Sequence, residues 1–194
     1  MKKMSTSAIV FIGMMTAISV VLSFVLKIPM LAPWLKLDFS FVPMMLTGFA
    51  LGPVAGLCVL LLTNLIHLFA SNSGMVGQLA DVLMGACYLL PAAVIYRVQH
   101  TRKGALIGMG VGTLCLIAGG IIANLYILLP LYLGSGWAEK LSRFGFSSPG
   151  NLIAAAVLPF NLIKGAVVSL ITAILYKRLS RLLRAAEQKE RNRK

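Results

Sequence analysis

The chain has 194 residues, of which 59% are hydrophobic, and it carries 18 lysines and arginines against only 5 acidic residues. Its mean hydropathy of +0.90 excludes an ordinary soluble domain and indicates an integral membrane protein. A net charge of +13 is compatible with nucleic-acid binding, but eight of the basic residues lie in the tail 177–194. This distribution indicates membrane topology and contact with anionic lipid of the bilayer, and no nucleic-acid partner is expected.

Apolar segments predict an all-α protein with a single domain, a bundle of six transmembrane helices at about 20 residues per crossing. These segments run over residues 8–26, 41–51, 54–69, 75–96, 105–133 and 151–176. The N-terminal segment resembles a signal peptide, but it has no small-residue cleavage site before Lys27, so we interpret it as the first span. The second segment is short, and we expect flanking residues, a thinned bilayer or burial by neighbouring helices to compensate.

The basic residues predict the orientation. An even number of spans places both termini on one side, and that side holds thirteen lysines and arginines. They are Lys2, Lys3, Arg97, Arg102, Lys103 and the eight of the tail. The opposite loops hold four, Lys27, Lys36, Lys140 and Arg143. We therefore predict that both termini are cytoplasmic and that 177–194 is a basic cytoplasmic tail.

Lys164 interrupts the apolar run 152–175. A charged side chain at the centre of a bilayer costs about 2.5–3.5 kcal/mol, so it normally faces the bundle interior or a water-filled cavity and has a partner. Asn161 lies three residues earlier, on the same helix face. Lys164 either pairs with a carbonyl or an acid to hold helices together, or it faces a ligand. The second interpretation is favoured, because intramembrane ionisable residues are usually functional.

The remaining polar groups support binding rather than catalysis. No nucleophile and base occur at a recognisable spacing, no Gly-x-x-x-x-Gly-Lys phosphate loop is present, and Cys58, Cys87 and Cys115 have no metal-binding spacing. We expect no catalytic residue, no metal site and no cofactor. A small organic ligand in a mostly apolar pocket fits the inventory better.

Asn124 can donate and accept hydrogen bonds at once, which suits the edge of a heterocycle. An interhelical hydrogen bond, worth about 0.6 kcal/mol in a membrane, is an equally good explanation. His67 is interpreted as a helix-end residue, and Gln78 and Asp81 as residues that cap the fourth span or line its entrance. Trp34 is either an interfacial aromatic residue or a cover for a pocket mouth.

Gly13 and Ala17 form a small-x-x-x-small pattern in the first span. This pattern lets another helix approach closely, and spacing alone favours packing within the same bundle.

Several short stretches, taken together, resemble a known family. They are LKLDFS at 35–40, GFALGPVAG at 48–56, NLIH at 64–67, LPAAVIY at 90–96, the stretch 124–132, and LPFNLIKG at 158–165. In this order and spacing, over nearly the whole chain, they resemble the substrate-binding S components of energy-coupling factor (ECF) vitamin transporters. The likeness is greatest to the riboflavin-specific members.

The resemblance implies a protein of the bacterial cell membrane with riboflavin, or a related flavin, as the transported ligand. It implies six helices, cytoplasmic termini, and a pocket open to the outside under the loop after the first helix. It implies that Gly13 and Ala17 pack on a transmembrane coupling subunit and that two partner ATPases hydrolyse ATP. Asn124 and Lys164 are implied to hydrogen-bond the flavin ring. The full set of candidate substrate-binding residues is Trp34, Leu37, Asp38, Asn64, Asn124, Tyr126, Asn161 and Lys164.

The sequence departs from the family pattern at three positions. Relatives often carry an acid and a lysine where this chain has Leu60 and Thr63, and an acid where it has Phe41. If the acid and the lysine form an ion pair that the protein can do without, both can be lost together. An altered binding pocket explains the same replacements equally well. Two alternatives therefore stay open: an S component for another vitamin or heterocycle, and an unrelated ion-coupled carrier or membrane enzyme.

Overall fold

A computed structural model describes residues 5–70 and 74–191, with side chains described over 5–69 and 75–176. Lys2, Lys3 and the side chains of the basic tail lie outside these ranges. The molecule is mostly helical, and four of its helices are long and apolar enough to cross a membrane by length and composition. They are Thr6–Val25, Met75–Gln99, Arg102–Leu133 and Pro149–Tyr176. The prediction of an all-α membrane protein is confirmed at this level.

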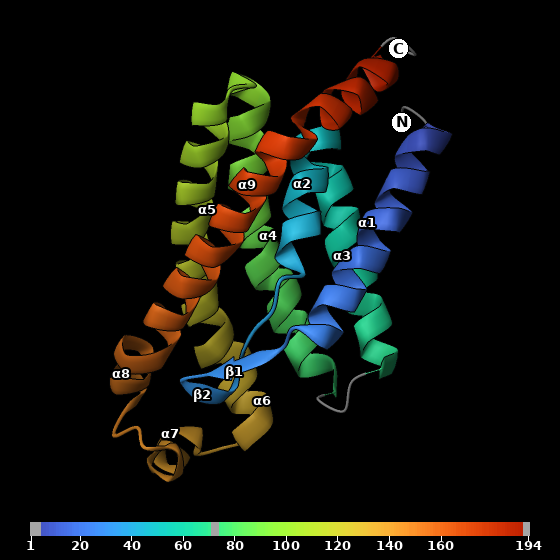
Figure 1. Ribbon diagram of the computed structural model, residues 1–194. Helices are drawn as coiled ribbons and strands as arrows, with labels where there is room; N and C mark the ends of the chain where they lie inside the picture. The colour runs from blue at the N-terminus through green and yellow to red at the C-terminus, as the bar shows by residue number, and fades with distance from the viewer. Residues whose placement is uncertain (1–4, 71–73, 192–194) are drawn as a thin grey trace.

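The chain forms a bundle that is closed at one end by a small hairpin and short helices (Figure 1). In order, the main elements are α1 (Thr6–Val25), β1 (Ile28–Met30), β2 (Ala32–Leu37), α2 (Phe41–Leu51), α3 (Pro53–Ala70), α4 (Gly74–Gln99) and α5 (Arg102–Ala123). They are followed by η1 (Asn124–Leu128), α6 (Leu129–Leu133), α7 (Trp137–Lys140), η2 (Leu141–Phe144), α8 (Pro149–Leu152), η3 (Ile153–Val157) and α9 (Leu158–Arg191). The start of α1 and the end of α9 lie at the end of the bundle opposite the hairpin.

The short helix α2 is the centre of the bundle. Every residue from Phe41 to Ala50 is buried, although the helix has only 11 residues and a length of about 16 Å. Gly52, at φ 99°, turns the chain directly into α3. Of the three explanations considered for this short segment, the structure supports burial by neighbouring helices.

Close approach of backbones fixes α4 against α5. A Cβ added at Gly108 would lie 2.7 Å from the Ala92 carbonyl oxygen, and one added at Gly112 would lie 2.5 Å from that of Tyr88. Real Cβ atoms do not come so close, so these two glycines are required for the packing. Small residues serve this purpose in membrane helices, where packing rather than water drives association.

The segment after α1 is an antiparallel β-hairpin where the sequence predicted only a loop, with Ile28 opposite Leu37. Within β2, Leu35 and Leu37 are buried while Lys36 between them is exposed, which is the period-two pattern of a half-buried strand; Ala32 is also buried but lies outside this alternation. The pattern is only a few residues long, and each strand of the hairpin contains a proline, Pro29 or Pro33, so the strand signal is weak.

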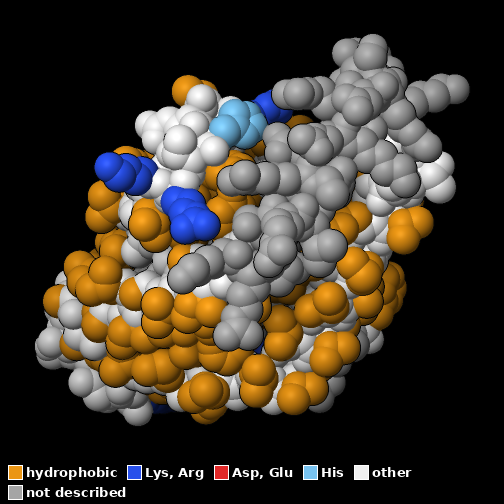
Figure 2. Space-filling view, turned by 45° about the horizontal axis from the view of Figure 1, so that its top comes forward, with side chains coloured by type: hydrophobic (Ala, Val, Ile, Leu, Met, Phe, Trp, Pro, Cys, Tyr) orange, Lys and Arg blue, Asp and Glu red, His pale blue; other side chains and the backbone are white. Residues whose placement is uncertain are grey.

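The flank of the bundle is apolar. Figure 2 shows many hydrophobic side chains on the lower part of the view and basic side chains near one end. Among the described residues, leucines such as Leu61, Leu114 and Leu170 are exposed. An exterior of this kind is typical of a protein surrounded by lipid.

Gly13 and Ala17 both lie on the exposed face of α1. A Cβ added at Gly13 would have no heavy atom within 4 Å. The small-residue pair therefore does not pack within the described part of its own bundle, contrary to the expectation from spacing alone.

Candidate functional site

A cavity of about 140 Å³ lies beside the hairpin, among α1, β2, α3, α4, α6 and α9. Its apolar lining comes from Trp34, Leu35, Met84, Leu128 and Phe160, among others. Its polar lining consists of Ser23, Lys27, Lys36, Asp38, Ser40, Thr63, Asn64, His67, Gln78, Asp81, Tyr132 and Lys164. Small-molecule sites usually combine an apolar wall with convergent polar groups, and this cavity has both, with an unusually large polar share.

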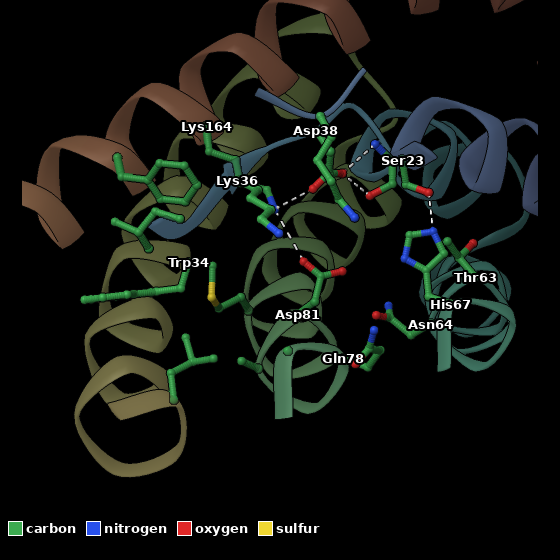
Figure 3. A pocket seen from close by; sticks show the side chains of 18 of the residues that line it. Ser23, Trp34, Lys36, Asp38, Thr63, Asn64, His67, Gln78, Asp81 and Lys164 are labelled. Carbon is green, nitrogen blue, oxygen red and sulfur yellow. Dashed lines mark hydrogen bonds and ion pairs between the residues drawn. The ribbon is translucent and has the colours of Figure 1, made fainter. Parts of the chain in front are cut away.

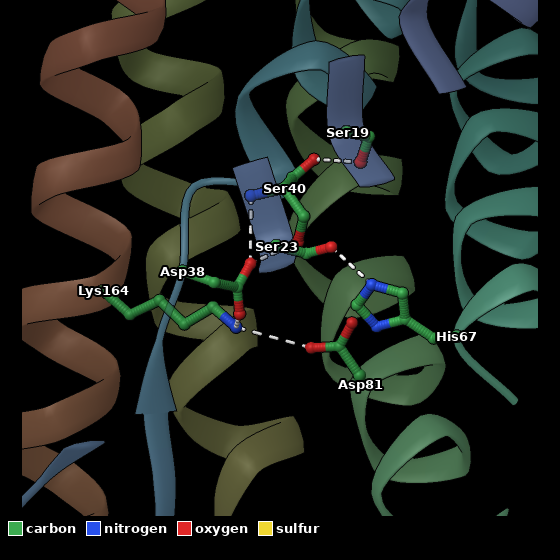
Figure 4. Close-up of polar contacts among 7 residues, drawn as sticks. All are labelled: Ser19, Ser23, Asp38, Ser40, His67, Asp81 and Lys164. Atoms are coloured by element: carbon green, nitrogen blue, oxygen red, sulfur yellow. Dashed lines mark hydrogen bonds and ion pairs between the residues drawn. The ribbon is translucent and has the colours of Figure 1, made fainter. Parts of the chain in front are cut away.

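Lys164 is the centre of the polar lining (Figure 4). Its Nζ lies 3.4 Å from Asp38 Oδ2 and 3.4 Å from Asp81 Oδ1, and its side chain is only 2% exposed. The ammonium also lies 4.0 Å from the centroid of the Phe41 ring, in a cation–π contact. The triad of Lys164, Asp38 and Asp81 therefore joins α9, the segment before α2, and α4. Lys164 pairs with two acids, as the first interpretation expects, and it also lines the cavity. That it faces a ligand stays a prediction.

Asp38 is held by its neighbours in the turn before α2. The Ser40 backbone N–H donates to Asp38 Oδ1 at 2.9 Å, and the Ser40 hydroxyl donates to the same oxygen. The Ser40 carbonyl in turn accepts from Ser19 Oγ of α1 at 2.8 Å. Burial raises the pKa of Asp38, but the Lys164 ammonium and the Ser40 hydrogen bonds outweigh it and hold this pKa below its usual value.

Asn124 is fully buried and contacts the hairpin through Trp34. Its Nδ2 donates to the Gly120 carbonyl at 2.8 Å, and its Oδ1 accepts from Trp34 Nε1 at 3.2 Å. The Trp34 ring also packs edge-on against Phe144 of the η2 segment, with centroids 5.2 Å apart. Trp34 thus lines the cavity from the hairpin side, and its indole N–H occupies the side-chain oxygen of Asn124.

Asn161 is also fully buried and packs on Gly120, one turn from Asn124. A Cβ added at Gly120 would lie 2.4 Å from Asn161 Nδ2. Asn161 Nδ2 donates to the Val157 carbonyl at 2.8 Å, while its Oδ1 has no hydrogen-bond partner among the described residues. The π-helical turns η1 and η3 lie beside these two asparagines. Such turns are frequent at functional sites.

The structure brings four candidate residues into the cavity lining, namely Trp34, Asp38, Asn64 and Lys164. Asn124 and Asn161 lie buried beside it. Two others lie elsewhere: Leu37 is in the apolar core under the hairpin, and Tyr126 is 74% exposed on the outer face of η1.

Several residues that line the cavity were not predicted as site residues from the sequence. Asp81 was interpreted as a cap or entrance residue, but it is a partner of Lys164, 83 residues away. His67 lies in the last turn of α3, as predicted, but it also lines the cavity, where its Nε2 hydrogen-bonds Ser23 and its ring centroid lies 4.5 Å from that of Phe24. Thr63 also lines the cavity. The available signal was the rarity of ionisable groups within spans, which makes Asp81 a natural partner for Lys164. No group of three or more His, Cys, Asp or Glu side chains in the described residues is placed to hold a metal ion.

Comparison with known proteins agrees with this architecture. The family described as "ECF transporter, substrate-specific component" matches residues 7–176. The riboflavin transporter RibU of Staphylococcus aureus (strain TCH60) is 38% identical over 177 residues, which cover 91% of this chain and 92% of the relative. The riboflavin transporter FmnP of Bacillus subtilis (strain 168) is 29% identical, with coverages of 91% and 93%.

A solved structure of the S component of a bacterial ECF transporter has the same fold. It superposes with a TM-score of 0.75 at 37% sequence identity, covering 91% of this chain and 96% of the other. The predicted resemblance is confirmed, and the chain belongs to the family of substrate-specific S components of ECF transporters.

Proposed function

We propose that this chain is the riboflavin-binding S component of an ECF-type importer in the bacterial cell membrane. The observation that carries the proposal is similarity, over nine-tenths of the chain, to curated relatives that are riboflavin transporters. The chain belongs to a family of transport subunits that bind substrate, so it is not an enzyme and riboflavin is cargo rather than a cofactor. These relatives do not favour another vitamin, an ion-coupled carrier or a membrane enzyme.

The cavity suits a flavin chemically. Riboflavin joins a flat aromatic ring, whose edge carries carbonyl and N–H groups, to a polyhydroxyl chain. Trp34, Leu128 and Phe160 offer an apolar surface to a ring. Lys164 supplies a donor for a ring carbonyl. Asn124 Oδ1, once the indole leaves it, and Asn161 Oδ1, which has no partner among the described residues, supply acceptors for a ring N–H.

Ligand binding requires the cavity to widen. Sites for drug-sized ligands have volumes of about 300–1,000 Å³, and this cavity is smaller, at about 140 Å³. The Trp34 indole occupies Asn124 Oδ1 and covers the same space. We therefore expect Trp34 and the β1–β2 hairpin to shift when riboflavin enters, with a ligand group taking the place of the indole N–H at Asn124.

Six membrane crossings with both termini in the cytoplasm are the topology that best supports this function. The four long apolar helices are joined by the shorter apolar helices Phe41–Leu51 and Pro53–Phe69. The start of α1 and the end of α9 lie at the same end of the bundle, opposite the hairpin, and the cavity is lined in part by β2 of that hairpin. The excess of basic residues on the terminal side then follows the positive-inside rule, and the cavity opens toward the outside.

The energy for uptake comes from partners. The chain has no phosphate-binding loop of its own. In its family the S component works with a transmembrane coupling subunit and two ATPases. The exposed Gly13 and Ala17 offer a place on α1 where a partner helix can come close, and we assign the coupling subunit to this face.

The test is a ligand-extraction experiment. Protein purified in detergent from cells grown with riboflavin should carry a yellow fluorescent compound, which denaturation releases as riboflavin. Protein stripped of ligand should then bind riboflavin at a one-to-one ratio by calorimetry. A colourless protein that fails to bind riboflavin but binds a different vitamin would contradict the proposal.

A further inference from the structure

The two phenylalanines of α2 each contact a tyrosine of α4. The Phe41 and Tyr88 rings stack with their centroids 6.3 Å apart. The Phe49 and Tyr96 rings lie closer, with their centroids 4.7 Å apart. The phenylalanines are eight residues apart on α2 and the tyrosines are eight residues apart on α4, a rise of about 12 Å on each helix. Because both helices run from the hairpin end of the bundle to the opposite end, the two contacts have matching spacing (Figure 1).

Both tyrosines are also joined to α9, which runs in the same direction. The Tyr88 hydroxyl lies 2.7 Å from Ser169 Oγ, and the Tyr96 hydroxyl lies 2.6 Å from that of Tyr176. The Tyr176 ring lies edge-on to Phe49, with the centroids 6.1 Å apart, and all five aromatic side chains are at most 6% exposed. We call this arrangement the aromatic ladder, with a cavity rung of Phe41, Tyr88 and Ser169 and a terminal rung of Phe49, Tyr96 and Tyr176.

The ladder fixes the position of α2 along the bundle axis. Between the rungs, a Cβ added at Gly48 would lie 2.6 Å from Leu89 Cδ1 and 3.5 Å from Ala93 Cβ, so α2 lies close against α4. Apolar contacts are non-directional, and this one opposes separation of the helices more than sliding. No side-chain hydrogen bond caps the start of α2. A slide by one turn, about 5.4 Å, would separate both phenylalanines from their tyrosines, so the two rungs together oppose it.

The position of α2 in turn sets one wall of the cavity. Asp38 and Ser40 directly precede the helix, and Asp38 Oδ2 lies 3.4 Å from Lys164 Nζ (Figure 3). Lys164 Nζ also lies 4.0 Å from the ring centroid of Phe41, in the cavity rung. A shift of α2 would therefore displace the acid and the ring that hold Lys164 at the same time.

We infer that Phe49, Tyr96 and Tyr176 are positioning residues for the ligand cavity. None of the three lines the cavity, and they lie toward the opposite end of α2. They act through that helix: the terminal rung fixes α2, and the fixed helix places Asp38 against Lys164. The inference rests on the proposed function where it concerns riboflavin, whereas the fixed position of α2 is a property of the ligand-free protein.

Two substitutions in the terminal rung test this role. Phe49→Leu removes both ring contacts and keeps an apolar core, and Tyr176→Phe removes one hydroxyl and keeps every ring. The milder Tyr176→Phe gives an independent test if Phe49→Leu fails to fold. The matched control is Tyr126→Phe, the same change on the outer face of η1, where the side chain is 74% exposed. For each full-length protein, freed of ligand in detergent, we would measure riboflavin affinity by calorimetry and hydrogen exchange of the α2 backbone amides.

Both variants should weaken riboflavin binding about twofold to tenfold, the equivalent of one aromatic contact or one neutral hydrogen bond, and the control should bind as wild type does. Without ligand, exchange should quicken at residues 41–46, at the far end of α2, because the whole helix loses its fixed position. Faster exchange confined to residues 47–51, with unchanged affinity, would overturn the positioning role and leave only a local packing contact. Wild-type protein that does not bind riboflavin would overturn the proposed function instead, and exchange at residues 41–46 would still decide whether the ladder fixes α2.

Discussion

Replacing Lys164 with methionine should destabilise the protein even without ligand. The side chain is 2% exposed, and its ammonium lies 3.4 Å from a carboxylate oxygen of both Asp38 and Asp81. Methionine keeps most of the volume but leaves the two carboxylates without their cation. Removing one partner of a buried ion pair costs about 3–5 kcal/mol, so we expect the free energy of unfolding to fall by about that amount.

A compensating variant distinguishes charge from packing. If the loss comes from stranded carboxylates, adding Asp38→Asn and Asp81→Asn to Lys164→Met should recover most of it. Neutral replacement of buried ions at similar volume is often neutral or stabilising. If the loss comes from a poorly fitting methionine, the triple variant should be no more stable than the single one.

Reversible unfolding of ligand-free protein in mixed micelles measures these free energies, with fluorescence of Trp34 and Trp137 as the signal. Riboflavin affinity is measured on the same samples. Lys164→Met should weaken binding by about 1.5–3 kcal/mol, the range for a hydrogen bond to a charged group, and the triple variant should not restore it. A Lys164→Met protein as stable as wild type would refute the structural role of the triad, and unchanged affinity would remove Lys164 from the binding site.

Three further predictions follow from other contacts. Asn124→Leu should weaken riboflavin binding by about 0.5–1.5 kcal/mol in calorimetry, because it removes a buried hydrogen-bonding amide, and unchanged affinity would remove Asn124 from the binding site. The pKa of Asp38 is lower in the folded state than in the unfolded state. The carboxylate therefore contributes its full stabilisation above the usual aspartate pKa of about 3.9, and this stabilisation is lost as the pH falls through the lower folded pKa. The free energy of unfolding should therefore drop in acid, and less steeply in Asp38→Asn; identical slopes would contradict the assignment. Gly13→Leu and Ala17→Trp should leave riboflavin affinity nearly unchanged but sharply reduce copurification with the coupling subunit and ATP-dependent uptake, and normal uptake in both variants would refute that interface.

Hydropathy predicted the helical segments well, because lipid and core both select apolar residues over long runs. The apolar run at 41–51 corresponds to α2 over Phe41–Leu51, and the segment at 54–69 corresponds to α3 over Pro53–Ala70. Hydropathy alone does not distinguish burial in protein from contact with lipid. For that reason the central position of α2 emerged only from the structure.

The site was only partly predictable. Lys164 was identifiable because a single charge in an apolar run is conspicuous, but its partners lie 126 and 83 residues away in the sequence. Nothing local in the sequence specifies such a pairing. Tyr126 is two residues from Asn124, about half a helical turn, so its side chain lies on the opposite face of the helix and is 74% exposed. Nearness in sequence to a candidate residue was therefore a poor guide to a position in the cavity.

The short central helix, the hairpin and the cavity have a common physical origin. A helix of 11 residues spans about 16 Å of a hydrocarbon layer about 30 Å thick. The chain preceding α2 enters the bundle as the extended strand β2, followed by a bend and a turn at residues 38–40 (Figure 1). Irregular backbone at membrane depth is tolerated only where protein buries it or where it lines a cavity. This segment is both buried and part of the cavity wall. The Ser40 N–H donates to Asp38, and the Ser40 carbonyl accepts from Ser19. Asp38 forms an ion pair with Lys164 at the wall of the cavity. A full-length second helix would fill this space, so the space for a ligand depends on α2 being short.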